Sequence, residues 1–512
     1  MNDWTSGYVS TIGYTHGYYG ELNPLHAQFA FLSAGYKLPR IKTACELGFG
    51  QGLSTVIHSA SSNVSWYGTD FNPDQATYAN DLASASNCSA NLSDDSFEEY
   101  INRKDLPEFD FIALHGIWSW VSTDNRKILI DFIRRKLKLG GVVYISYNTL
   151  PGWSTFAPIR QIMTQHVDRL STSGSGIEKQ IAGALDFAQK LLELDTTFKN
   201  NNPTALERLE NTKKHDPHYL AHEYFNKDWT PTYFSEIADR LSAAKLSYVT
   251  SAAFLEHVNQ LSYSENQQKL ISEIPDSIFR ESVKDFMANQ SFRRDYWAKG
   301  LQQYSQLEYL ERFRAQNVIL SKSTENIELK VSGNLGEMEL KKEIYEPIIN
   351  FLEKTPVTSI GQIELGVKAA GIDFANLSQA ILILLAMSVI RPAQQEEQII
   401  NCESTVSRLN NELLSRAVSG RHVGFMASPV LGGGMVVDRL EQLFLAAMAK
   451  DIKQAGERAD FVLNVFESLG QALLSNEGEI IESRSGSINR LIELHKSFEE
   501  NRLPLLKRMK II

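Results

Sequence analysis

A glycine-rich turn between an apolar strand and a helix constrains this 512-residue chain more than any other feature. The segment IKTACELGFGQG, residues 41–52, has the pattern of a strand followed by a tight turn, and a helix is predicted from about Leu53. Glycines let the backbone turn sharply and let a ligand approach it closely. Asp70 ends the next predicted strand, 18 residues after Gly52. This is close to the ~20-residue spacing of a carboxylate that binds ribose hydroxyls. The pattern predicts a nucleotide site on an α/β sheet, and a glycine turn without a ligand is the alternative.

The spacing of the glycines narrows the type of nucleotide. Dinucleotide-binding loops follow the pattern G-x-G-x-x-G, whereas this loop reads G-x-G-x-G and is preceded by Glu46. A carboxylate at this point would repel a pyrophosphate, but it suits a ligand that carries an amine and a sulfonium. The pattern resembles motif I of class I S-adenosylmethionine-dependent methyltransferases. That resemblance implies S-adenosylmethionine as the cofactor.

Strands and helices alternate along much of the chain, which predicts a parallel sheet. We expect a Rossmann-like class I methyltransferase sheet, of class α/β, formed by residues 1–153 and 226–304. Within it, Thr230 and Pro231 are expected to begin a helix, and SFRRDYWAKG is a candidate last strand. Residues 154–225 have a helical pattern and predict an α-helical insertion. Residues 305–512 predict a mainly α C-terminal region with a winged-helix-like unit at 339–395.

Three further segments extend the resemblance over most of the chain, from about residue 8 to residue 445. They are HGIWSWVSTDNRKILIDFIRRKLKLGGVVYISYNTLPGW, AHEYFNKDWTPTYFSEIADRL and ASPVLGGGMVVDRLEQLFL. They are similar to bacterial methyltransferases that carry a methyltransferase regulatory domain, a group that includes protein-lysine methyltransferases acting on bacterial surface proteins. The resemblance implies methyl transfer to protein lysine. The chain departs from many members in Phe49, where Cys is common, and in its tyrosine-rich N-terminus.

The resemblance assigns cofactor-binding roles to particular residues. Motif I corresponds to Glu46, Gly48, Gly50 and Gly52, whose backbone packs against the methionyl part of the cofactor in such enzymes. Asp70 corresponds to the ribose-binding carboxylate, and Phe71 flanks the adenine. Asp95 is the candidate acid on the adenine side, although Asp94 is equally placed. Solvated turn acids are the alternative interpretation for Asp94 and Asp95.

Aromatic residues and one histidine are the candidates for the catalytic side of the site. His115 and Trp118 follow a predicted strand at the carboxyl edge of the sheet, where open α/β sheets bind ligands, and His115 is expected to contact the cofactor as well. An aromatic face attracts a nearby cation by ~0.5–2 kcal/mol. Tyr14, Tyr18 and Tyr19 belong to a segment expected to cover the cofactor as a lid. Core or surface packing is the alternative for each of these residues, as it is for Trp120. Further along the chain, we interpret Tyr147, Asn148 and Trp153 as substrate-side residues, and His222 and Glu223 as structural or hinge residues.

Composition and charge exclude several other classes of protein. Three cysteines in wide spacing exclude a disulfide framework and a CxxC zinc site, and no metal-ligand set is visible. The net charge of −10 argues against a general nucleic-acid binder. The N-terminus lacks the pattern of a signal peptide, and no apolar run is long enough to span a bilayer.

We therefore expect a cytoplasmic methyltransferase with a protein substrate, no membrane association and a homodimer as a candidate assembly. A small-molecule or glycan methyltransferase and a cofactor-binding regulatory scaffold are the alternatives.

Overall fold

The computed structural model describes residues 15–37, 40–171, 174, 176–475 and 478–512. Within these ranges a seven-stranded sheet has the order β3-β2-β1-β4-β5-β7-β6. Its strands are β1 (Thr43–Leu47), β2 (Ser65–Thr69), β3 (Ala90–Ser93), β4 (Phe109–Leu114), β5 (Leu137–Asn148), β6 (Ser247–Ser251) and β7 (Phe292–Ala298). The strands β1 to β5 pair in parallel, and β7 lies antiparallel between β5 and β6. The predicted α/β class is confirmed.

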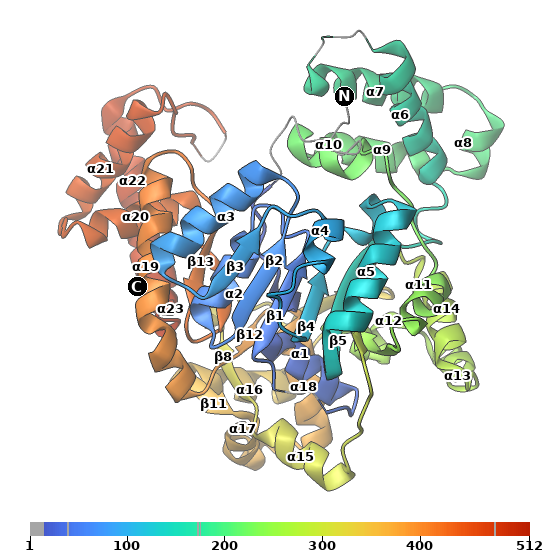
Figure 1. Cartoon of the computed structure of the whole chain (residues 1–512). Helices are drawn as coiled ribbons and strands as arrows, with labels where there is room; N and C mark the ends of the chain where they lie inside the picture. Colours follow the sequence, from blue (N-terminus) through green and yellow to red (C-terminus); the bar gives the residue numbers. More distant parts are fainter. Residues whose placement is uncertain (1–14, 38–39, 172–173, 175, 476–477) are drawn as a thin grey trace.

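Helices cover both faces of this sheet, as Figure 1 shows. They include α1 (Pro24–Ser33), α2 (Leu53–Ser61), α3 (Pro73–Ser86), α4 (Phe97–Ile101), α5 (Thr123–Lys136) and α11 (Phe234–Ser242). Helix α3 begins where Asn72 accepts a hydrogen bond from the amide of Asp74, and Pro73 occupies the first turn, where its missing amide hydrogen costs little. Helix α5 ends at Lys136, and the long strand β5 starts directly after it.

The predicted start of helix α11 at Pro231 is wrong. The helix begins at Phe234, after a stretch that runs along the end of the sheet. The amide of Thr230 donates to the carbonyl of Ser119, and that of Thr232 donates to the carbonyl of Asn148. These backbone bonds hold the segment extended, so the Thr-Pro signal for a helix start is overridden by tertiary contacts.

The predicted insertion consists of helices in the structure. They are α6 (Ala157–Leu170), α7 (Ile177–Glu193), α8 (Thr197–Asn201), α9 (Ala205–Lys213) and α10 (Pro217–Tyr224). They enclose a hydrophobic cluster of their own that contains Trp153 and Phe156, and the guanidinium of Arg208 lies over both of these rings. Figure 1 shows the group at one end of the sheet. Its outer boundaries stay a prediction.

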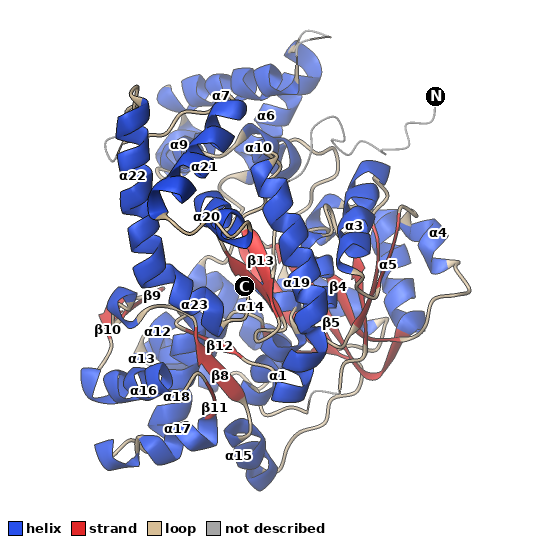
Figure 2. Ribbon diagram, turned by 90° about the vertical axis from the view of Figure 1, so that its left-hand side faces the viewer, coloured by secondary structure: helices blue, strands red, loops and turns tan. Residues whose placement is uncertain are grey.

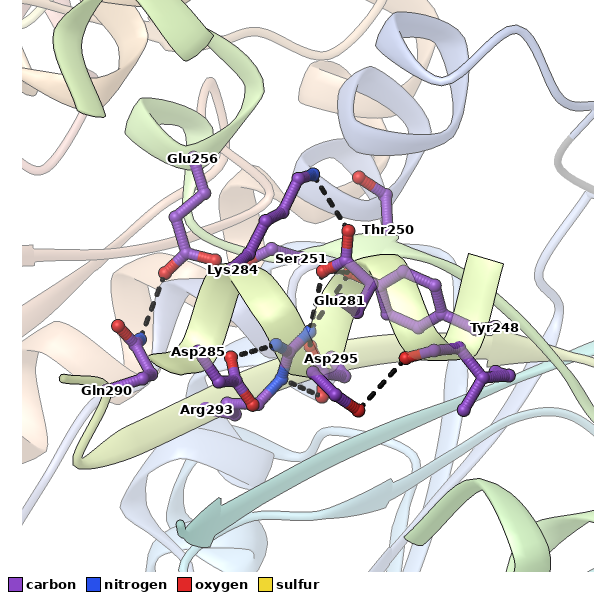
Figure 3. Close-up of polar contacts among 12 residues, drawn as sticks. Tyr248, Thr250, Ser251, Glu256, Glu281, Lys284, Asp285, Gln290, Arg293 and Asp295 are labelled. Carbon is purple, nitrogen blue, oxygen red and sulfur yellow. Dashed lines mark hydrogen bonds and ion pairs between the residues drawn. The ribbon is translucent and has the colours of Figure 1, made fainter. Parts of the chain in front are cut away.

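The short helices α12 (Asn259–Ser262) and α13 (Glu265–Ser272) lead to α14 (Ser277–Ala288), and a buried charge cluster attaches strand β7 to α14 (Figure 3). Arg293 of β7 forms ion pairs with Glu281 and Asp285 of α14 and with Asp295 of its own strand. The hydroxyl of Tyr147 donates to Asp295 at 2.7 Å. Because the buried guanidinium has several carboxylate partners, its burial is compensated and β7 is fixed to both β5 and α14.

The C-terminal region begins with α15 (Gln306–Arg314), and the range 339–395, where a winged-helix-like unit is predicted, contains three α-helices. Its helices are α16 (Lys342–Lys354), α17 (Ile360–Gly366) and α18 (Phe374–Ala386). The strands β8 (Asn317–Leu320), β11 (Val357–Ser359) and β12 (Ile390–Pro392) form a small antiparallel sheet against them, and β9 (Lys330–Gly333) pairs with β10 (Gly336–Glu339). Strand β8 lies outside the predicted range 339–395, so that range omits the central strand of the small sheet.

The rest of the C-terminal region packs directly on the large sheet domain. It contains α19 (Glu396–Val418), the hairpin β13 (Phe425–Ser428) and β14 (Gly433–Val436), and the helices α20 (Arg439–Ala449), α21 (Ala455–Ser468), α22 (Arg484–Ser497) and α23 (Leu503–Arg508). Helix α19 lies beside α3 and β13 (Figures 1 and 2). All nine residues of α2 are buried, and Val56 and Leu409 belong to one hydrophobic cluster. In the described part of the chain, no helix is long and apolar enough to cross a membrane.

Candidate functional site

A cavity of about 370 Å³ lies at the carboxyl ends of strands β1, β2 and β4. The glycine loop after β1, the starts of α2 and α4, the loop after β4 and helix α10 with the residues that follow it all contribute to its wall. Among the predicted site residues, the lining contains Glu46, Gly48, Gly50, Gly52, Asp70, Phe71 and His115. The structure therefore brings together residues that are up to 69 positions apart in the sequence, as the α/β pattern predicts.

The glycine loop turns through conformations that side chains rarely adopt. Gly48 has φ +73° and Gly52 has φ +66°. A Cβ on Gly52 would lie 2.4 Å from the Cβ of Ala79, and one on Gly48 would lie 2.6 Å from Ile117. Glycine is therefore required at both points, and the loop backbone forms an open cradle at the bottom of the cavity.

Glu46 is the last but one residue of β1 and is almost completely buried beside this loop. The hydroxyl of Thr55 in α2 donates to its carboxylate. Burial and the nearby charge of Asp70 raise the pKa of Glu46 to about 8. A positively charged ligand in the cavity would favour the ionised form of this side chain.

Asp70 follows β2 and connects two parts of the cavity wall. Its Oδ2 accepts a hydrogen bond from the amide of Gly50 at 2.8 Å, and its Oδ1 accepts one from the amide of Asn72 at 3.1 Å. Burial raises its pKa to about 7, against the opposing effect of these hydrogen bonds. The carboxylate and the neighbouring Phe71 line the same cavity, an arrangement that suits a ligand with hydroxyl groups and a flat ring.

Asp95 is not among the described residues that line the cavity. Its carboxylate forms an ion pair with Arg103 at 3.1 Å. The next three residues, Ser96, Phe97 and Glu98, provide this side of the wall. They lie at the start of helix α4, where Ser96 and Glu99 form a capping box. The capping pattern S-x-x-E is present in the sequence and could have indicated these residues.

The aromatic segment before α1 reaches the cavity through Tyr19. Its ring stacks on His115 with centroids 3.5 Å apart, and the Nδ1 of His115 lies 3.1 Å from the hydroxyl of Tyr144. Burial lowers the pKa of His115 to about 4, so the imidazole is neutral at pH 7. Burial, with the nearby charges of Glu46 and Glu223, raises the pKa of Tyr19.

The structure does not bring Tyr18 into this cavity, because successive side chains of the extended segment point in different directions. Its ring packs against His58 and Phe425 and faces the glycines of strand β14. The predicted catalytic residue Tyr14 lies outside the described residues, and the lid prediction is untested there.

The two tryptophans of the loop after β4 lie in different places: Trp118 is in the core, and Trp120 is at the cavity. Trp118 is completely buried in the core beneath the sheet, with the guanidinium of Arg126 over its ring, so the structure corrects its proposed place beside the reacting groups. Trp120 lies in the cavity lining. A 3₁₀ turn at Trp118–Trp120 points the two rings to different sides.

Four residues at and after the end of the insertion complete the cavity, and two of them differ from their predicted roles. His222, Glu223, Asn226 and Asp228 all contribute to the lining. The sequence predicts structural or hinge roles for His222 and Glu223, since neighbours on a helix point about 100° apart. Both nevertheless reach the cavity because α10 ends at its edge. The resemblance of the segment AHEYFNKDW to family members was the available signal.

The predicted substrate-side residues Tyr147, Asn148 and Trp153 are not in the described lining. Tyr147 belongs to the Arg293 cluster, and Trp153 packs inside the insertion. The described residues contain no group of His, Cys, Asp and Glu side chains that could hold a metal ion.

Comparison with known proteins identifies the family. Residues 216–299 match the family model described as a predicted methyltransferase regulatory domain. The protein sll1526 of Synechocystis is 37% identical over 99% of this chain and 99% of its own length, and RP789 of Rickettsia prowazekii is 26% identical over 54% of this chain and 49% of its own.

Two solved structures of PKMT2 from Rickettsia typhi share the fold. The one in complex with AdoHcy has a TM-score of 0.69 at 17% identity and covers 95% of this chain and 98% of that chain. The other has a TM-score of 0.67 at 16% identity, with 97% and 99% covered. The chain belongs to the same family as sll1526, matches the methyltransferase regulatory domain at residues 216–299, and has the class I S-adenosylmethionine-dependent methyltransferase fold that it shares with PKMT2.

Proposed function

We propose that this protein transfers methyl groups from S-adenosylmethionine to lysine side chains of a protein substrate. The observation that carries the proposal is the charge of the cavity. Its described lining contains five carboxylates and neither Lys nor Arg: Glu46, Asp70, Glu98, Glu223 and Asp228. Such a lining favours the two cations of this reaction, a sulfonium and an ammonium, and their positive charge in turn favours the ionised forms of Glu46 and Asp70.

The residues at the sheet edge fit the cofactor. The glycine loop would hold its methionyl part, Asp70 its ribose hydroxyls, and Phe71 its adenine, which agrees with the roles implied by the sequence resemblance. When bound, S-adenosylmethionine supplies a methyl group on a positively charged sulfur, and this sulfur leaves as a neutral thioether. The protein then has to orient the acceptor and exclude water. Orientation alone can lower the activation free energy by ~7–11 kcal/mol.

The acceptor side consists of aromatic and acidic groups. Tyr19 and Trp120 offer ring faces that attract an ammonium by ~0.5–2 kcal/mol, and Glu223 and Asp228 add negative charge from the end of the insertion. An acceptor amine must lose its proton before it attacks. The partly buried aromatic surroundings disfavour the charged amine and assist this loss.

The sequence similarity to protein-lysine methyltransferases and the shared fold with PKMT2 support lysine as the acceptor. All three cysteines are free, which supports the reducing cytoplasm as the compartment. A homodimer stays a prediction.

The experiment uses S-adenosylmethionine with a labelled methyl group and a lysate fractionated into proteins and small molecules. We expect label in protein, released by hydrolysis as methyllysine. Label in small molecules or glycans would contradict the lysine proposal. Glu223→Gln should raise the KM for the protein acceptor, and Glu210→Gln, an exposed substitution in α9 of the same insertion, is the matched control.

A further inference from the structure

A second cavity, of about 290 Å³, lies where the N-terminal segment meets the C-terminal region. Its wall comes from the segment before α1, from the end of α18 with strand β12, and from the hairpin β13–β14. Its volume is just below the ~300–1,000 Å³ that small-molecule sites occupy, which suits a small ligand. The roles assigned above to the first cavity use none of the side chains that line this one.

Arg391 of β12 supplies positive charge to this second cavity. Its Nη1 donates to the carbonyl of Gly434 at 3.3 Å, and among the described residues no carboxylate oxygen lies within 4 Å of its guanidinium. The carboxylate of Glu21 also faces the cavity but forms an ion pair with Arg294. The Nε2 of His26 lies 2.7 Å from the carbonyl of Ala252. Arg391 is therefore the cation that an incoming anion would meet.

The rest of the wall is mostly apolar, with polar groups at one side. The apolar side chains are Phe254, Leu385, Ile390, Phe425, Leu431 and Val436. The side chain of Asn23 is held by the carbonyl of Leu431 at 2.9 Å, and the hydroxyl of Tyr18 interacts with Asn23 and Gly434. A planar guanidinium binds carboxylates and phosphates through two parallel hydrogen bonds. We propose that this cavity binds a small organic anion, whose carboxylate or phosphate pairs with Arg391 and whose apolar body contacts the surrounding hydrophobic side chains.

The position of this site connects it to the methyltransferase cavity. Tyr18 lines the second cavity, and Tyr19, the next residue, lines the first and stacks on His115. An anion that displaces Tyr18 would move the backbone that places Tyr19. Because binding free energies are reciprocal, the anion and the cofactor would then change each other's affinity by the same factor.

The binding test uses the full chain with two probes, 3-phenylpropionate and phenyl phosphate, and the neutral amide 3-phenylpropionamide as their control. Ligand-observed NMR should show binding of at least one anion and much weaker binding of the amide. Arg391→Gln keeps a donor for the carbonyl of Gly434 but removes the charge, and it should weaken anion binding by about tenfold or more. Unchanged AdoHcy affinity shows that this variant is folded.

A second pair of variants keeps the test decisive if Arg391→Gln does not fold. Val436 lines the cavity and is 54% exposed, so charged residues are tolerated there. Val436→Glu should weaken anion binding, and Val436→Lys should not. The site is overturned if neither anion binds up to about 10 mM, if the amide binds equally well, or if the charge changes have no effect. Saturation with the anion should also change AdoHcy affinity, and no change would overturn the coupling alone.

Discussion

The ring of Tyr19 lies on the imidazole of His115, with centroids 3.5 Å apart and planes inclined by 25°. The backbone of Tyr19 is fixed as well. Its amide donates to the hydroxyl of Ser54 at 3.2 Å, and its carbonyl lies 3.1 Å from the Nε2 of His58. Both partners belong to α2, the helix that begins at the glycine loop. The aromatic segment is therefore attached to the elements that form the bottom of the cavity.

Replacing Tyr19 by Ala should lower kcat/KM for methyl transfer by about tenfold to a hundredfold, because it removes the aromatic wall and one side of the stack. Tyr233→Ala, at an exposed tyrosine, should have no effect. Tyr19→Phe separates the ring from the hydroxyl: retained activity assigns the effect to the ring. Full activity of Tyr19→Ala would contradict a role for this residue.

Asp70→Asn should weaken cofactor binding by ~1.5–3 kcal/mol, about tenfold to a hundredfold, since hydrogen bonds to a charged group are lost. Isothermal calorimetry with AdoHcy measures the change. Asp74→Asn, an exposed substitution at the start of α3, is the control. Equal affinities of the Asp70 variant and the unmodified protein would show that the carboxylate does not bind the ribose.

Cofactor affinity should depend on pH because burial raises the pKa of Glu46 to about 8 and of Asp70 to about 7. Near pH 7 in the free protein, Glu46 is therefore mostly protonated and Asp70 is about half protonated. Binding of a sulfonium favours the ionised forms of both carboxyls, so affinity for S-adenosylmethionine should rise between about pH 6 and 9. For each proton released on binding, the affinity should rise by up to about tenfold per pH unit. AdoHcy lacks the positive charge, and its affinity should rise less steeply. Parallel pH profiles for the two ligands would contradict this electrostatic account.

The same pKa values predict the pH dependence of stability without ligand. A carboxyl whose pKa is higher in the folded state binds more protons there than in the unfolded chain. The free energy of unfolding should therefore decrease as pH rises from about 4 to 8, and S-adenosylmethionine should offset part of the loss at the upper end. Thermal unfolding across this range measures both effects.

Gly52→Ala should destabilise the protein for two separable reasons. The left-handed conformation costs ~1–2 kcal/mol for a side chain, and the new Cβ would lie 2.4 Å from that of Ala79. Gly35→Ala, with a similar φ of +78° and open space around it, isolates the first cost. The double variant Gly52→Ala with Ala79→Gly should recover the second. Without such recovery, the contact with Ala79 would not be the source of strain.

The two tryptophans of the loop after β4 should give opposite results. Trp118→Ala removes a completely buried ring and should cost ~3–5 kcal/mol of stability. Trp120→Ala should leave the melting temperature almost unchanged and lower methyl transfer. Thermal unfolding and turnover, measured on both variants, distinguish core from cavity, and a large loss of stability in Trp120→Ala would contradict this division.

The sequence predicts what depends on local pattern. The strand–glycine–helix signal at Glu46 and Gly52 and the carboxylate at Asp70 place the cofactor cradle, because each is a short-range feature with a physical cause. Local pattern does not show which of two nearby aromatic residues faces the cavity, because that depends on contacts with distant parts of the chain. The sequence therefore does not separate Tyr19 from Tyr18, or Trp120 from Trp118.

Long-range contacts also account for the other differences. The antiparallel direction of β7 follows from its pairing with β5, and the extended backbone at Thr230 follows from bonds to Ser119 and Asn148. Helix α19 covers α2, and nothing in the local sequence of either helix specifies that partner.

The complete burial of α2 has a consequence during synthesis. Leu53–Ser61 leaves the ribosome more than 300 residues before the segment 396–436 that covers its outer face. Until then the helix presents an uncovered apolar side to the cell, and the cofactor loop at its N-terminus rests on an unfinished support. A ribosome stalled before residue 396 would therefore display a chain that chaperones bind, and methyl-donor binding would begin only after residues 396–436 have left the ribosome.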